Sequence, residues 1–147
     1  MEPMITVALN AARKAALLLE KATQHRGPQM IELKSRNDFV TEVDKAVEKE
    51  IIYNLRKAYP THCFHGEEGG YIEGEDKDSE WIIDPIDGTR SFIIGSPTWS
   101  NLISVNYKKK PILGLVNFPM LKKYYITGAN SSSYLVENNK FKKLHIA

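Results

Sequence analysis

The sequence lacks several features that would assign it to a known class of protein. It holds a single cysteine, Cys63, so no disulfide can form within the chain and a small disulfide-stapled fold is excluded. Its longest apolar runs, such as Ala15 to Leu19, fall far short of the ~20 residues needed to cross a bilayer. Its first residues, Met-Glu-Pro, do not open a secretory signal. We therefore expect a cytoplasmic protein without a membrane partner.

A large net charge is also missing. The 20 basic and 18 acidic residues leave a net charge of +2, which by itself indicates neither a nucleic-acid nor a membrane partner. The charges are nevertheless segregated, because residues 67–87 hold one basic and nine acidic side chains, whereas residues 88–147 hold nine and one. Lysines at turns and strand ends keep sheet edges soluble. We favour that interpretation over a nucleic-acid-binding module and expect no nucleic-acid partner.

The residues that are present suffice for one domain over 1–147, since 42% of them are apolar. Apolar positions recur every three or four residues over 4–24 and 40–58, which predicts two amphipathic helices, the second capped by Asn37 or Asp38. Short β-like runs separated by turn residues follow. The predicted strands cover residues 61–65, 81–84, 102–107, 112–118, 123–127, 133–136 and 141–146. The sequence therefore predicts an α+β fold with two N-terminal helices packed on a mostly antiparallel sheet.

A strand that ends in two carboxylates is the most informative segment. In Trp81-Ile82-Ile83-Asp84-Pro85-Ile86-Asp87-Gly88-Thr89, the proline fixes φ, so a stiff turn can aim Asp84 and Asp87 at one point with the Ile86 carbonyl between them. Two carboxylates and a carbonyl form an oxygen-only ligand set, which suits Mg²⁺ better than zinc or copper. The pattern Asp-Pro-x-Asp-Gly also occurs in ordinary surface turns. This segment alone does not decide between a site and a turn.

Two neighbouring features favour the site. Gly88 lets the backbone approach an anion closely, and the N–H groups of Gly88 and Thr89 would point at a phosphate. Upstream, Gly66-Glu67-Glu68-Gly69-Gly70 brings more carboxylates on a loop that leaves another strand. If the two strands are neighbours, Glu67 can reach the same cation. The combination is more specific than any of its parts.

These segments resemble the inositol monophosphatase family of magnesium-dependent, lithium-sensitive phosphatases. The resemblance rests on Gly66-Glu67-Glu68, on residues 81–89 and on the stretch from Lys34 to Asp44, and it extends over essentially the whole chain. Within the family, Asp87-Gly88-Thr89-Arg90-Ser91-Phe92 is most similar to the histidinol-phosphatase-like branch.

The resemblance implies a role for each matching residue. Glu67, Asp84, Asp87 and the Ile86 carbonyl match the family's metal ligands. Asp44 and Thr89 match a hydrogen-bonded pair that helps orient the nucleophilic water, with Glu67 assisting, and residues 87–89 match the phosphate-binding turn. The implied activity is magnesium-dependent hydrolysis of a small phosphate monoester, of the inositol monophosphate or histidinol phosphate class, by metal-activated water.

The sequence also departs from the family. Family members continue into a C-terminal α/β half with a Trp-Asp-x-Ala-x-Gly signature, and neither Trp81 nor Trp99 begins such a motif. The expectation is therefore an N-terminal half whose sheet face is left uncovered, with self-association into a homo-oligomer such as a dimer as the remedy. A truncated, catalytically impaired fragment that binds metal and phosphate is the alternative function. A haloacid-dehalogenase-type site fits poorly, because Asp84 and Asp87 are one residue too far apart.

Overall fold

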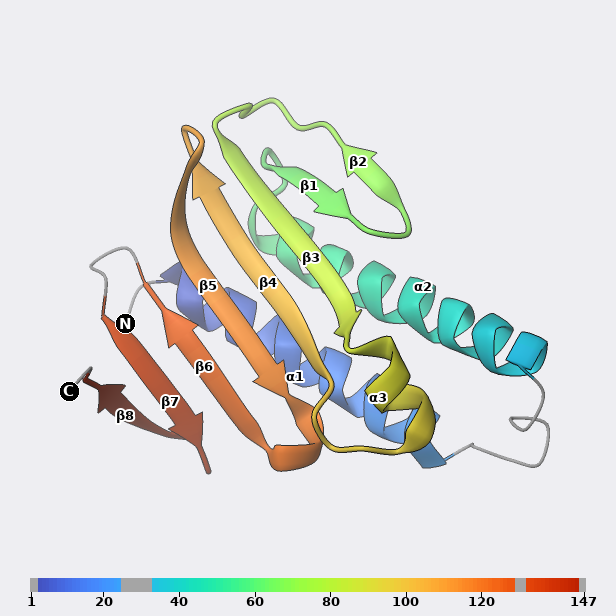
Figure 1. The fold of residues 1–147 in the computed structure, drawn as a ribbon. Helices are drawn as coiled ribbons and strands as arrows, with labels where there is room; N and C mark the ends of the chain where they lie inside the picture. The colour runs from blue at the N-terminus through green and yellow to red at the C-terminus, as the bar shows by residue number, and fades with distance from the viewer. Residues whose placement is uncertain (1–2, 25–32, 129–131, 146–147) are drawn as a thin grey trace.

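The structure is a computed structural model that describes residues 3–24, 33–128 and 132–145, and it places three α-helices and one sheet in them (Figure 1). The elements, in chain order, are α1 (Pro3–Gln24), α2 (Leu33–Ala58), β1 (Cys63–Gly66), β2 (Gly70–Ile72), β3 (Ser79–Asp87), α3 (Thr89–Ile94), β4 (Ser100–Tyr107), β5 (Lys110–Phe118), the 3₁₀ helix η2 (Pro119–Leu121), β6 (Lys123–Thr127), β7 (Ser133–Glu137) and β8 (Lys140–Leu144).

The strands form one eight-stranded sheet in the order β2-β1-β3-β4-β5-β6-β7-β8. From β3 to β8 each strand pairs antiparallel with the next, although helix α3 lies in the connection between β3 and β4. The exception lies between β1 and β3, which are parallel neighbours because β2 is placed outside β1. The predicted α+β architecture with a mostly antiparallel sheet is confirmed.

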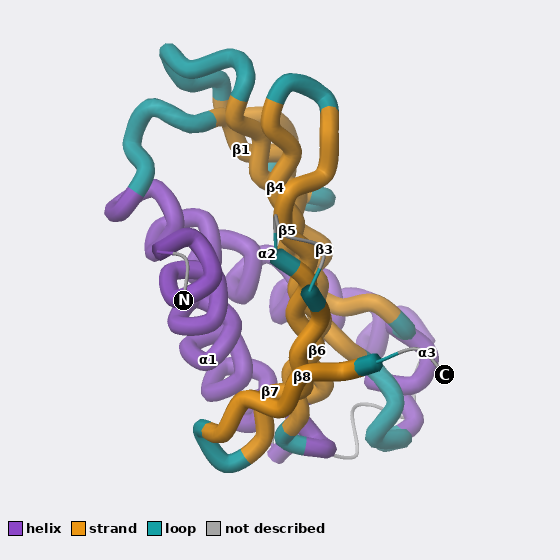
Figure 2. The backbone as a smooth tube through the Cα atoms, turned by 90° about the vertical axis from the view of Figure 1, so that its left-hand side faces the viewer, coloured by secondary structure: helices purple, strands orange, loops and turns teal. Residues whose placement is uncertain are grey.

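Helices α1 and α2 cover one face of the sheet (Figure 2). Alternate strand residues point toward them and are buried, among them Trp81, Ile83, Ile103, Val105 and Leu115. Helix α1 packs closely because its inner stripe consists largely of small residues, namely Ala8, Ala11, Ala12 and Ala15, all fully buried. No helix in the described ranges is long and apolar enough to cross a membrane.

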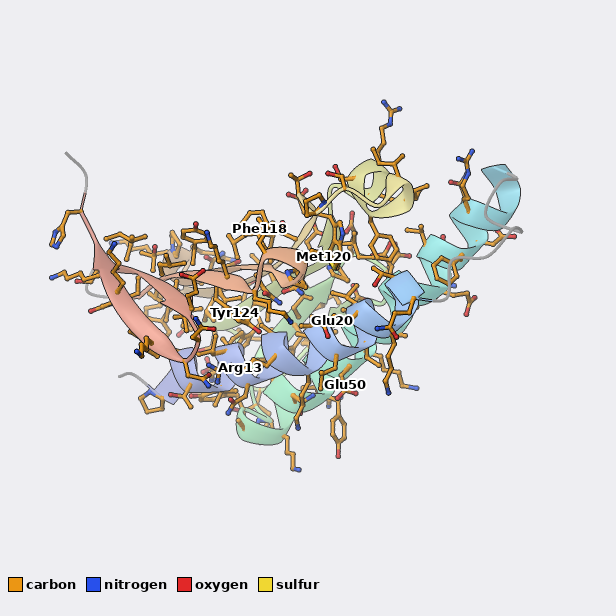
Figure 3. The ribbon with its side chains drawn as sticks, turned by 90° about the horizontal axis from the view of Figure 1, so that it is seen from below. Arg13, Glu20, Glu50, Phe118, Met120 and Tyr124 are labelled. Carbon is orange, nitrogen blue, oxygen red and sulfur yellow. The ribbon has the colours of Figure 1, made fainter. Side chains whose placement is uncertain are left out.

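Polar contacts fix α1 to the far half of the sheet (Figure 3). The Arg13 guanidinium stands 5.8 Å from the centre of the Tyr124 ring, and its Nη2 atom donates a hydrogen bond to Asn139 Oδ1 at 3.0 Å. Glu20 and Lys122 form an ion pair of 3.5 Å. These contacts join a helix and strands more than 100 residues apart in the chain, so the two helices and the whole sheet form one packed unit.

The opposite face of the sheet carries a row of partly exposed apolar side chains. Leu102, Val116, Tyr125 and Leu135 stand side by side in register across β4, β5, β6 and β7. The Tyr125 side chain is 37% exposed, and the other three are half-buried. Neither α1 nor α2 covers this row.

Several predicted boundaries were wrong. Helix α2 begins at Leu33, so Asn37 and Asp38 lie within it instead of capping it; residues 33–38 contain no proline or glycine to prevent the earlier start. The stretch 66–80, predicted as a loop, contains strand β2, and helix α3 was not predicted. The last strand, predicted over 141–146, is observed as β8 and ends at Leu144. The predicted final residue, Ile146, lies outside the described residues.

Candidate metal and phosphate site

The pairing of β1 with β3 brings Glu67 and Asp84 together. Gly66 is opposite Ile83 in the last pair of this parallel ladder, so the next residues, Glu67 after β1 and Asp84 within β3, stand at the same level. A hydrogen bond with Asp84 is the largest cause of the raised pKa of Glu67, so the two side chains lie close together. The condition stated from the sequence, that the two strands be neighbours, is therefore met.

Strand β3 does not end in the predicted turn but continues through a bulge. Asp84 pairs with Leu102 and Asp87 pairs with Ser100, so three steps on β3 face two steps on β4. Pro85 lies inside this irregularity, where its missing N–H costs no ladder hydrogen bond. The extra residue resets the alternation, so Ile86 is buried in the core while Asp87 is exposed at the end of the strand.

Gly88 turns the chain from β3 into α3. Its φ of 84° and ψ of 48° lie in the left-handed region, which favours glycine. Its carbonyl accepts the hydrogen bond from the Phe92 N–H at 3.0 Å, which closes the first turn of α3. The Phe92 ring is buried edge-on against Trp99 at 5.0 Å and anchors the helix. Thr89 is thereby placed at the exposed first position of a short helix, directly after Asp87 and Gly88.

Asp44 reaches the same region from α2. The residue is only 8% exposed, and its Oδ1 atom is buried without a hydrogen-bond partner in the described structure. Burial raises the pKa of Asp44 to about 7, and the negative charges of neighbouring carboxylates add to this effect. These charges belong to Glu68, Glu67, Asp84 and Glu48, in decreasing order of influence.

Glu67 shows the same crowding of negative charge. Its pKa is raised to about 7, first by the hydrogen bond with Asp84, then by desolvation and by the charges of nearby carboxylates. Asp84 also has a buried oxygen, Oδ1, that lacks a partner in the described structure. Buried acceptors without donors, among carboxylates that repel one another, are the surroundings that a bound cation stabilises. The residues present therefore fit Mg²⁺, which prefers oxygen ligands.

The arrangement is not a finished coordination shell. The described residues contain no group of three or more His, Cys, Asp or Glu side chains already close enough to hold a metal ion. The negative charges of Glu67 and Asp84 are close enough to raise the pKa of Asp44. The junction of β3 and α3, next to them, holds Asp87, Gly88 and Thr89. The side chain of Lys34, part of the stretch matched to the family, lies outside the described part of the structure.

Sequence reasoning missed Glu48, a buried carboxylate beside the site. It stands one helical turn after Asp44 and follows Val47, a residue of the buried stripe of α2. A charged residue next to an apolar stripe is usually read as solvent-facing. The signal that could have revealed it is the spacing Asp44-x-x-x-Glu48, which places two acidic side chains on one edge of the helix.

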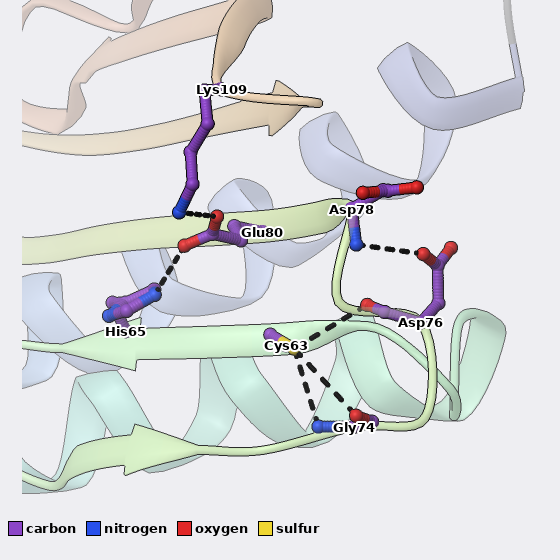
Figure 4. A network of polar contacts seen from close by, with 7 residues as sticks. All are labelled: Cys63, His65, Gly74, Asp76, Asp78, Glu80 and Lys109. Atoms are coloured by element: carbon purple, nitrogen blue, oxygen red, sulfur yellow. Dashed lines mark hydrogen bonds and ion pairs between the residues drawn. The ribbon is translucent and has the colours of Figure 1, made fainter.

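A polar network holds β1 against β3 near the site (Figure 4). Glu80 accepts a hydrogen bond from Lys109 Nζ at 3.0 Å and hydrogen-bonds His65 Nε2 at 2.8 Å. The Lys109 contact, followed by that of His65, lowers the pKa of the Glu80 carboxyl. The buried Cys63 thiol accepts the Gly74 N–H at 3.4 Å and ties down the loop after β2. The strand that presents Glu67 is thus fixed on both sides.

Comparisons with known proteins identify relatives of this fold. Nus factor SuhB of Haemophilus influenzae is 47% identical over 120 residues, which cover 82% of this chain and 45% of that protein. The extragenic suppressor protein suhB of Bartonella henselae superposes with a TM-score of 0.80 at 28% identity, over 91% of this chain and 51% of that one. Inositol monophosphatase II of Staphylococcus aureus gives 0.76 at 27% identity, over 90% and 48%.

The chain spans about half the length of the curated relatives it matches. Over that half the agreement is continuous, since the family model of inositol monophosphatases matches residues 1–146. The fold, the carboxylate cluster and this match lead to the same conclusion: the chain belongs to the inositol monophosphatase family.

Proposed function

We propose that this protein takes part in magnesium-dependent hydrolysis of a small phosphate monoester. The observation that carries the proposal is the pair of buried carboxylate oxygens on Asp44 and Asp84 that lack partners in the described structure, beside Glu67. The Gly88 turn directly follows β3, the strand that holds Asp84. Such a cluster is stabilised by a cation, and the adjoining turn offers N–H groups to an anion. The family model supports a phosphatase, although relatives at 47% identity are named Nus factors.

The chain's own residues divide into three roles. Glu67, Asp84, Asp87 and the Ile86 carbonyl would hold Mg²⁺, which when bound supplies a Lewis acid and an acidified water. Asp44 and Thr89 would accept and orient the proton of the attacking water. The backbone N–H groups of Gly88 and Thr89, with Asp87 beside them, would position the phosphate. Catalysis of this kind rests on positioning and charge neutralisation.

The substrate class follows from a smaller set of residues. The segment Thr89-Arg90-Ser91-Phe92 favours histidinol phosphate over inositol monophosphate. Arg90 is exposed on α3, next to the proposed phosphate turn, where a second cationic group could meet a charged substrate. We keep both substrates for the experiment and place the reaction in the cytoplasm.

A second candidate function is the binding of metal and phosphate without catalytic turnover. The relatives named Nus factor favour it, because that name gives them a role other than hydrolysis. In this case the basic segment 88–147 becomes relevant, and salt-dependent retention of the protein on an RNA column would support it. Mg²⁺ binding without phosphate release would be its other sign.

The open row of Leu102, Val116, Tyr125 and Leu135 is the surface through which we infer self-association. Side chains in one continuous row on one face of a sheet are stabilised when a second apolar surface excludes water. A second copy of the chain offers a matching surface by symmetry. The predicted dimer would form through this face.

Phosphate release with Mg²⁺ titrated tests the proposed activity. Inositol monophosphate and histidinol phosphate are offered to the wild-type protein, to Asp87→Asn and to Asp78→Asn, an exposed aspartate in the loop before β3. We expect Mg²⁺-dependent release that Asp78→Asn keeps and Asp87→Asn loses by about 100-fold or more, since a lost ligand removes cation and phosphate positioning together. Release that is independent of Mg²⁺, or equal in both variants, would contradict the proposal.

A further inference from the structure

Glu48 is buried under the loop that carries Glu67, although the proposed chemistry does not use it. Only 3% of its surface is exposed. A buried carboxylate is retained where hydrogen bonds compensate for lost hydration. Its Oε1 atom accepts the Glu68 N–H at 2.9 Å, and its Oε2 atom accepts the Gly69 N–H. Both oxygens are therefore committed to the backbone of one loop.

Two glycines make room for this carboxylate. A Cβ atom at Gly66 would overlap the carboxyl group of Glu48, and one at Gly69 would stand 2.8 Å from its Oε2 atom. Neither glycine has a positive φ, so backbone conformation does not explain them. The space that the Glu48 carboxyl group occupies explains both glycines. The Gly-Glu-Glu-Gly loop is thus complementary in shape to a side chain about 20 residues earlier in the sequence.

Strand pairing does not support the backbone of the loop at residues 67–69. The β1–β2 ladder pairs Gly66 with Gly70 and leaves residues 67–69 outside it. Hydrogen bonds from an N–H group to an ionised carboxylate are about twice as strong as neutral ones, so two of them fix the loop backbone firmly. The residue directly before these two donors is Glu67.

We propose that Glu48 is a positioning residue whose carboxylate anchors the backbone of Glu68 and Gly69 and so holds Glu67 against Asp84. The role in binding the cation rests on the proposed function, whereas the anchoring of the loop does not. Groups that orient metal ligands typically change metal affinity by about 10- to 100-fold when they are removed.

The charge of Glu48, without any anchoring of the loop, could also favour cation binding. Glu48 is also a negative charge near Asp44 and Glu67, so its loss would weaken attraction for any cation. Glu68 provides the matched control, because it is exposed and its charge acts on both groups more strongly than that of Glu48. The Glu68 carboxylate has no recorded hydrogen bond in the described structure. Glu68→Gln therefore removes the same charge and leaves the anchor intact.

Amide hydrogen exchange and Mg²⁺ affinity, measured on Glu48→Gln and Glu68→Gln, distinguish anchoring of the loop from the effect of charge alone. In Glu48→Gln we expect amide hydrogen exchange at Glu68 and Gly69 to accelerate about 10-fold or more, with exchange at Ile103 in the sheet core unchanged. We expect its Mg²⁺ affinity to fall at least about 10-fold below that of Glu68→Gln. Unchanged exchange at the loop, together with equal Mg²⁺ affinities in the two variants, would overturn the proposal.

A steric variant keeps the proposal testable if Glu48→Gln fails to fold. Gly66→Ala should accelerate exchange at Gly69 in the wild-type background but have little effect in a Glu48→Ala background, where the carboxylate is gone. Equal effects in both backgrounds would overturn the anchor. If the wild-type protein binds no Mg²⁺, the proposed function fails, and the exchange measurements still decide whether Glu48 anchors the loop.

Discussion

Glu67, directly after β1, stands beside Asp84 in β3, and a hydrogen bond with Asp84 is the largest cause that raises the pKa of Glu67 to about 7. With a pKa of about 7, Glu67 retains a proton at pH values at which carboxyls are usually ionised. Asp44, on a different element, has its pKa raised to about 7 in the same cluster. The metal-free protein therefore holds protons where the proposed function requires a cation.

Mg²⁺ binding should release these protons. Because the pKa values of Asp44 and Glu67 are about 7, both groups are largely protonated at pH 6 and largely ionised at pH 8.5. Titration calorimetry in two buffers of different ionisation heat counts the protons. We expect about one or more released per Mg²⁺ at pH 6, and clearly fewer at pH 8.5. Binding at pH 6 without any proton release would exclude Glu67 as a ligand and would show that the cation does not act on Asp44.

The stability of the metal-free protein should depend on the ionisation of Asp44. Its folded pKa of about 7 exceeds the ordinary 3.8, so the folded state binds more protons and stability falls as pH rises from about 4 to about 7. Asp44→Asn removes the charge. At pH 8 without metal we expect this variant to be more stable by about 1–2 kcal/mol, because solvent screens part of the full effect.

Urea unfolding at pH 5 and pH 8 measures this difference. The stability gain of Asp44→Asn should be clearly smaller at pH 5, where only part of the loss between pH 4 and pH 7 has occurred, and Mg²⁺ at pH 8 should stabilise the wild-type protein alone. Asp78→Asn serves as the exposed control. A variant less stable than wild type at both pH values would show that repulsion around Asp44 is not the dominant effect.

The turn at Gly88 should tolerate no side chain. Gly88→Ala places a Cβ at a φ of 84°, which costs about 1–2 kcal/mol of folding stability and disturbs the turn proposed to bind phosphate. Gly114→Ala in β5 is the matched control, since a Cβ there meets no atom within 4 Å. Thermal unfolding should separate the two variants. A Gly88→Ala protein as stable as Gly114→Ala would contradict the strained geometry.

The open apolar row predicts self-association that depends on its central residue. Val116 stands between Leu102 and Tyr125 in register, so Val116→Lys places a charge in the middle of the proposed interface. Sedimentation of the wild-type protein should show a dimer, and the variant should sediment as a monomer at the same concentration. Exposed Thr127→Lys, at the end of β6 and outside the row, provides the comparison. A wild-type monomer at all concentrations would exclude this surface as a dimer interface.

The long elements could be predicted because their patterns extend over several turns or strands. Helix α1 presents an unbroken stripe of alanine and leucine, and its predicted range is nearly the observed one. The start of α2 was misplaced because Asn37 is a good cap that the chain does not use as one. Strand β2 and helix α3, with three and six residues, are too short for a periodic signal.

The site could be predicted only where the chain is locally continuous. The segment from Asp84 to Thr89 was recognisable as a unit, and Glu67 joined it on the condition that β1 and β3 be neighbours. The bulge after Asp84 could not be predicted, because it arises from the pairing of β3 with β4. Glu48 was hidden for a similar reason, since its partners are backbone N–H groups of a distant loop.

The measurement that tests the central claim most directly is a calorimetric titration of Mg²⁺ into the wild-type protein, Asp84→Asn and Asp78→Asn at pH 8. The claim is that Glu67, Asp84 and Asp87 hold one cation beside Asp44, with the unpartnered oxygen of Asp84 as a ligand. We predict saturable binding in the wild type and in Asp78→Asn, with affinity about 100-fold lower or undetectable in Asp84→Asn. Equal Mg²⁺ affinity in all three proteins would contradict the account.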